Sequence, residues 1–129
     1  MRLFTAALAA GLLLAAPAFA RNYGEIVPRT SAMYKADTTP ADKIPALCAK
    51  IIADQNKSKV AMEDAGTLLF HGEMMGQHCV TVDYVKALTL EQKAGDMVQY
   101  SAFVKILRGR AATGNPGAVS AMEKLHLTP

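Results

Sequence analysis

Five side chains that can bind soft metal ions lie within nine residues of one another: His71, Met74, Met75, His78 and Cys79. Imidazole, thioether and thiolate groups suit copper, above all Cu(I). Their spacing matches no metal motif that we can name, and methionine also fills irregular gaps between packed helices. A disulfide at Cys79 would remove its thiolate. The segment therefore has two readings: a copper-binding or chaperone site formed by His71, Met74, Met75 and His78, or a loop that seals a helix seam.

The chain offers no local signature of an activated nucleophile. His78 and Asp83 can be paired on paper, with Ser58 or Ser101 as the nucleophile, but no strained turn of the kind that exposes a catalytic serine surrounds either serine. The adjacent carboxylates Glu63 and Asp64 would project about 100° apart on a helix and cannot act as a catalytic pair. We therefore expect no catalytic residues, no enzymatic activity and no cofactor.

The first twenty residues have the layout of a secretory signal peptide. Arg2 precedes an apolar run, and Ala18, Phe19 and Ala20 form a small-x-small cleavage pattern before Arg21. The run is short for a bilayer span. We predict three parts: a signal peptide at 1–20, an extended leader at 21–38 and a helical repeat domain at 39–129. The mature chain is expected to be periplasmic or secreted and free of the membrane.

Both cysteines of the chain, Cys48 and Cys79, lie in the part that is expected to be exported. An oxidising compartment favours a disulfide, and two cysteines leave a single possible pairing. The bond would tie the helix that holds Cys48 to the loop that holds Cys79. The mature chain carries 13 basic and 11 acidic side chains, and this small excess gives no argument for a nucleic-acid partner.

Hydrophobic periodicity and capping residues predict an all-α chain of about five helices. The first should begin at Thr39 and Pro40, with an apolar stripe of Ile44, Leu47, Cys48, Ile51 and Ile52. The second should follow Ser58 and end at Gly72. The third should have Thr81 as its cap and Asp83 in its first turn, and should end at Gly95.

Two further helices complete the expected set. Asp96 should cap a helix that carries Val98, Phe103, Ile106 and Leu107 and ends at Gly109. Asn115 and Pro116 should begin the last helix, with Val119, Met122 and Leu125 on its buried side.

A recurring pattern links the second and fourth of these helices. Ala65 and Gly72 recur 37 residues later as Ala102 and Gly109, a period typical of helical hairpin repeats. The fuller motif comprises Gly66, Leu68, Gly72, Asp83, Tyr84, Lys86, Ala87 and Leu88. It resembles the Sel-one-like repeat family, relatives of the tetratricopeptide repeat. Glu91 stands where that family commonly has an aromatic residue.

The resemblance implies a short α/α solenoid that acts by binding another protein. Tyr84 should pack within its hairpin, whereas Phe70 and Tyr100 should be exposed aromatic contacts on the concave surface. A short array with an uncovered end can also pair with a second copy, so a homodimer remains open. The sequence thus predicts an exported, non-catalytic interaction module, with periplasmic copper binding as the alternative.

Overall fold

The computed structural model describes Ala36 and residues 38–129, so the predicted signal peptide and almost all of the leader lie outside the described residues. Within them the protein is all-α, as predicted, with five α-helices, a short 3-10 turn and one small hairpin. The elements are η3 (Ala41–Lys43), α3 (Ile44–Ala53), α4 (Lys59–His71), β1 (Glu73–Met74), β2 (Gln77–His78), α5 (Tyr84–Ala94), α6 (Met97–Ala112) and α7 (Pro116–Lys124).

Polar side chains cap the starts of four helices. Ser58, Asp96 and Asn115 each accept a hydrogen bond from a backbone N–H three residues later, as their positions in the sequence predicted. For α5 the predicted cap was wrong: Asp83, and not Thr81, accepts from the backbone N–H of Lys86 at 3.0 Å.

The first helix begins later than expected. A 3-10 turn occupies Ala41–Lys43, and α3 starts at Ile44 with Pro45 in its first turn. Proline is tolerated there because the first N–H groups of a helix have no intrahelical partner. The predicted stripe is confirmed: Ile44, Cys48 and Ile51 are buried, and Leu47 and Ile52 pack against the core.

Left-handed glycines end two helices as predicted. Gly72 follows α4 with φ 75°, and Gly95 follows α5 with φ 80°. The predicted stop at Gly109 was wrong, because α6 continues to Ala112 and a later glycine, Gly114, takes the positive φ of 87°. A glycine ends a helix only where the chain adopts the left-handed conformation.

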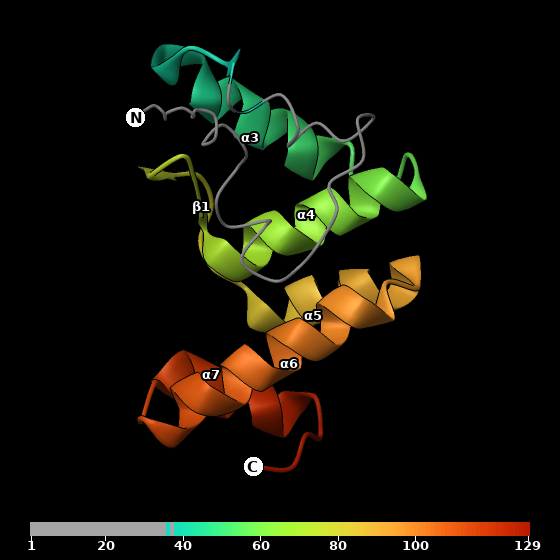
Figure 1. Ribbon diagram of the computed structural model, residues 1–129, viewed down its shortest axis with the longest axis vertical. Coiled ribbons are helices and arrows are strands. Elements are labelled where there is room, and N and C mark those ends of the chain that lie inside the picture. The colour runs from blue at the N-terminus through green and yellow to red at the C-terminus, as the bar shows by residue number, and fades with distance from the viewer. Residues whose placement is uncertain (1–35, 37) are drawn as a thin grey trace, which may run out of the picture.

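The helices follow one another along the longest axis of the molecule, from α3 through α4, α5 and α6 to α7 (Figure 1). Each helix packs on the next, and α7 also touches α5. One core of buried apolar side chains runs through all five helices. No helix among the described residues is long and apolar enough to cross a bilayer.

A valine predicted to be buried is exposed. Val119 of α7 is 41% exposed, and Val98 of α6 is 72% exposed. In α7 the small residues Ala118 and Ala121 are buried with Met122, because a short side chain allows a neighbouring helix to come close. The buried side of α7 is therefore rotated by about one residue from the side predicted from Val119, Met122 and Leu125.

The repeat-motif residues mostly serve the contact between α4 and α5. Leu68, Ala87 and Leu88 are fully buried. At Gly66 an added Cβ would lie 2.5 Å from the Glu91 carboxylate and 3.1 Å from the Ala87 carbonyl, so only glycine allows this approach. Glu91 is 0% exposed at this contact, and its carboxylate accepts a hydrogen bond from the Thr67 hydroxyl at 3.3 Å.

Candidate functional site

A short β-hairpin, with two residues in each strand, follows the end of α4. Glu73 pairs with His78, and Met74 pairs with Gln77. The turn residues Met75 and Gly76 have φ of 50° and 79°, the positive values of the tight turns whose twist matches a hairpin. Methionine rarely adopts this conformation, so the neighbouring contacts must hold the turn in place.

Several contacts fix the hairpin and the loop that follows it. Cys79 is bonded to Cys48 of α3, with their Cα atoms 5.7 Å apart, as predicted from the cysteine count. The Gly72 carbonyl, at the end of α4, accepts from the backbone N–H of Cys79 at 2.8 Å. The side-chain amide of Gln77 donates a hydrogen bond to the backbone carbonyl of Ala41 at 2.9 Å. The hairpin is thus anchored to both α3 and α4.

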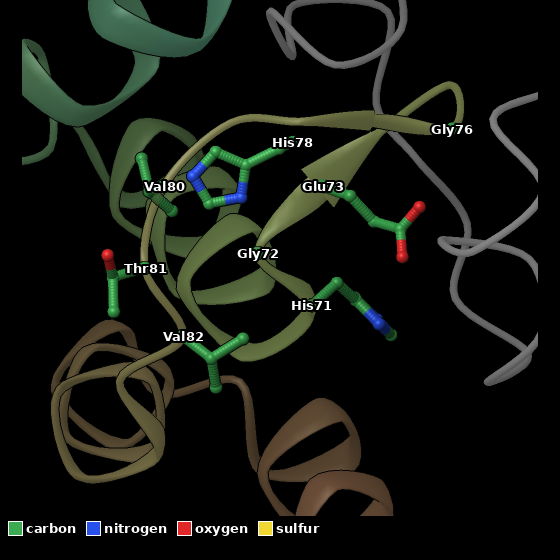
Figure 2. A pocket seen from close by; sticks show the side chains of 8 residues that line it. All are labelled: His71, Gly72, Glu73, Gly76, His78, Val80, Thr81 and Val82. Atoms are coloured by element: carbon green, nitrogen blue, oxygen red, sulfur yellow. The ribbon is translucent and has the colours of Figure 1, made fainter.

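A pocket of about 440 Å³ opens between the hairpin and the loop before α5. Figure 2 shows the side chains of His71 and Glu73 extending to one side, while His78 lies across the hairpin beside Val80. Two exposed apolar side chains accompany the pocket: Val82, on its wall, is 40% exposed, and Met75, at the hairpin tip, is 47% exposed. The lining residues are His71, Gly72, Glu73, Gly76, His78, Val80, Thr81 and Val82.

An aromatic cluster lies next to His71, at the end of α4. The rings of Phe70 and Phe103 are stacked, with centroids 4.0 Å apart, and Tyr84 meets Phe70 edge-on at 5.1 Å. Arg110 lies over the Phe70 ring at 5.3 Å and donates to the Tyr84 hydroxyl at 2.9 Å. These contacts join the end of α4 to the start of α5 and to α6.

His71 is held in its neutral form. Burial, and next the charge of Arg110, lower the pKa of His71 from 6.5 to about 4. Its ring also meets the rings of Phe70 and Phe103 edge-on. A neutral imidazole at the pocket wall can both donate and accept hydrogen bonds at physiological pH.

The predicted concave aromatics do not form an exposed surface. Phe70 is 0% exposed, and Tyr100 is half-buried against the core. The prediction for Phe70 was wrong because α4 is buried continuously from Asp64 to Phe70, so both sides of its apolar stripe are covered. Tyr84 packs on Phe70, as the sequence suggested.

The side chains considered for copper are dispersed. Met74 is fully buried, Met75 lies at the exposed turn, and Cys79 is in the disulfide. His71 and His78 extend in different directions (Figure 2). Within residues 38–129 and Ala36, no three histidine, cysteine or acidic side chains are grouped as metal ligands. Ser58 and Asp83, considered for catalysis, are both helix caps.

The sequence did not indicate the hairpin, and Glu73, Gly76, Val80, Thr81 and Val82 were not predicted as site residues. The available signal was Gly76, which favours a turn with positive φ. Strands of two residues are too short for an alternating pattern to be visible. Comparison of the chain with models of protein families, with curated proteins and with solved structures found no match.

Proposed function

We propose that this chain is an exported, non-catalytic interaction module built from Sel-one-like helical hairpins, and that it binds a partner protein through the anchored hairpin. One observation carries the proposal: the turn of the hairpin Glu73–His78, at Met75 and Gly76, is exposed, while both ends of the hairpin are held in place. Rigid presentation lowers the entropy cost of binding. The disulfide Cys48–Cys79 is compatible with the periplasm or the exterior of the cell.

The chemistry of the hairpin favours a protein surface as its partner. Met75 offers a flexible apolar side chain at the tip, and Val82 offers a second one on the pocket wall. Glu73, Gln77 and His78 supply polar groups around them. An apolar centre with a polar rim is the usual composition of a protein contact, in which an apolar side chain of the partner would fill the pocket.

Site-specific photo-cross-linking in living cells tests the proposal. A benzophenone amino acid replaces Met75, and the control places it at Met97 on α6, which has nearly the same exposure, 47% against 50%. We expect a discrete adduct with one partner protein from position 75 and none from position 97. The Met75 adduct should also disappear in a His78→Ala, Val82→Ser background. Indistinguishable adduct patterns from the two positions would contradict the proposal.

A further inference from the structure

The connection between α3 and α4 is a short turn that lies far from the hairpin. Because α3 ends at Ala53 and α4 begins at Lys59, the connection is Asp54–Ser58, with the sequence Asp-Gln-Asn-Lys-Ser. The hairpin follows the other end of α4, whose 13 residues span about 20 Å. Figure 1 shows the turn at the right-hand end of α4 and β1 at its left-hand end. A group attached to the turn would therefore leave the hairpin uncovered.

The contacts that shape this turn are local. Asp54 forms ion pairs with Lys50 and Lys57, and its backbone carbonyl accepts from the backbone N–H of Lys57 at 2.9 Å. Among the described residues, the turn makes hydrogen bonds and ion pairs only within residues 50–62. A modifying enzyme can therefore reshape the turn while α3 and α4 stay packed on the core.

Asn56 presents its side-chain amide to solvent in the middle of the turn. The residue is exposed, and its amide has no hydrogen bond to any described residue. Asparagine often ends a helix in the left-handed conformation, but the described residues other than glycine with positive φ are Met75 and His126. Neither a helix end nor a hydrogen bond therefore uses this amide.

Ser58 completes an acceptor sequence for glycosylation. Asparagine followed two positions later by serine or threonine, with any residue except proline between them, is the site of N-linked glycosylation in exported proteins. Asn56–Ser58 is the one such sequence in the chain. In bacteria the transferring enzyme also recognises an acidic residue two positions before the asparagine, and Asp54 holds that position. The whole recognition sequence thus coincides with the connection between the two helices.

We propose that Asn56 is an attachment site for an N-linked oligosaccharide, which an oligosaccharyltransferase transfers from a polyprenyl diphosphate after export. The side-chain nitrogen of Asn56 forms a bond to C1 of the first sugar, while the bond from C1 to the diphosphate oxygen breaks. The nitrogen gives one proton to a base of the enzyme. The polyprenyl diphosphate leaves with the electron pair of the broken bond.

Intact mass spectrometry tests the proposal on the protein purified from the periplasm or the medium of its natural host. We expect a chain that lacks its signal peptide and is heavier than the polypeptide by one oligosaccharide, which peptide fragmentation should place on Asn56. Asn56→Gln should remove the added mass. It should also leave the Met75 cross-link unchanged, because the turn lies at the opposite end of α4 from the hairpin.

The inference rests on the export that the proposed function assumes, and the measured masses distinguish the two. A chain without its signal peptide and with the mass of the bare polypeptide would overturn the glycosylation alone. A cytoplasmic chain that retains residues 1–20 would overturn the glycosylation together with the proposed export.

Two substitutions at Ser58 separate glycosylation from helix capping, since the Ser58 hydroxyl also accepts from the backbone N–H of Ala61 at 3.0 Å. Ser58→Thr keeps both the hydroxyl and the cap, whereas Ser58→Asp keeps the cap and lacks the hydroxyl. We expect Ser58→Thr to retain the added mass and Ser58→Asp to lose it, with the same helical circular dichroism in both. An added mass that survives in Ser58→Asp or in Asn56→Gln would lie on another residue and overturn the proposal.

Discussion

Reduction of the Cys48–Cys79 bond should remove a large part of the stability of this protein. The two residues are 31 apart in the sequence. Closing a loop of this length in the unfolded chain costs about 12 cal/mol/K of entropy, or about 3.7 kcal/mol at 25 °C. A small domain has about 5 to 15 kcal/mol in total. Because the chain has two cysteines, reduction breaks this bond and leaves every side chain in place.

Urea unfolding followed by circular dichroism, with and without reductant, measures the effect. With a urea dependence of about 1.5 kcal/mol per molar, the midpoint should fall by about 2.5 M. A mass gain of about 2 Da confirms that reduction is complete, since it adds two hydrogen atoms. A midpoint that falls by less than about 0.5 M would refute the reasoning, because it would mean that the bond constrains neither state of the chain.

Two other predictions concern the helix contact and the buried imidazole. Gly66→Ala should lower the free energy of unfolding by about 1 to 3 kcal/mol, because the added Cβ meets Glu91. Gly109→Ala should raise the free energy of unfolding by about 0.5 to 1 kcal/mol, because an added Cβ there has nothing within 4 Å and alanine favours the helix. If urea unfolding showed Gly66→Ala to be the more stable of the two variants, this packing would be contradicted. His71 has a pKa of about 4 when folded and 6.5 when unfolded, so the unfolded state takes up the proton first and stability falls as the pH drops from 6.5 to 4. After allowance for solvent screening, protonation of His71 lowers the free energy of unfolding by about 2 kcal/mol. Between pH 7 and pH 4 the free energy of unfolding of His71→Gln should therefore fall by about 2 kcal/mol less than that of the unchanged protein, as measured by urea unfolding at both pH values.

The helices could be predicted because their signals are local. Asp96 and Asn115 cap helices wherever they precede a helical run, and Gly72 and Gly95 take the left-handed conformation at helix ends. The errors arose where two local signals compete. Thr81 and Asp83 are both capping residues and lie two positions apart. In the structure the backbone N–H of Asp83 donates to the Leu69 carbonyl of α4, a long-range contact that the local sequence does not show.

The site could not be predicted because it depends on long-range contacts. Phe70 was expected to be exposed on the assumption that α4 has one covered side. In the structure α5, α6 and the hairpin all contact the end of α4, so that Phe70 is enclosed by Tyr84 and Phe103. No periodicity within α4 reports how many neighbours the helix has. The hairpin was missed for a related reason, since its conformation depends on the disulfide and on the Gly72 carbonyl.

The contacts between α4 and α6 also separate what a sequence repeat determines from what it does not. The recurrence of Ala65 and Gly72 aligns the two helices at an offset of 37 residues, whereas the stacked rings of Phe70 and Phe103 meet at an offset of 33. The difference is close to one helical turn, so the same sides of the helices face each other at either offset. The two helices also end differently: α4 ends at His71, before Gly72–Asp83 leads to α5, whereas α6 continues past Gly109 to Ala112, and residues 113–115 lead to α7. The recurring glycine therefore ends one helix and lies inside the other. The spacing of like residues in the sequence thus indicates which sides of the helices meet, but it does not fix how far the helices are shifted along each other.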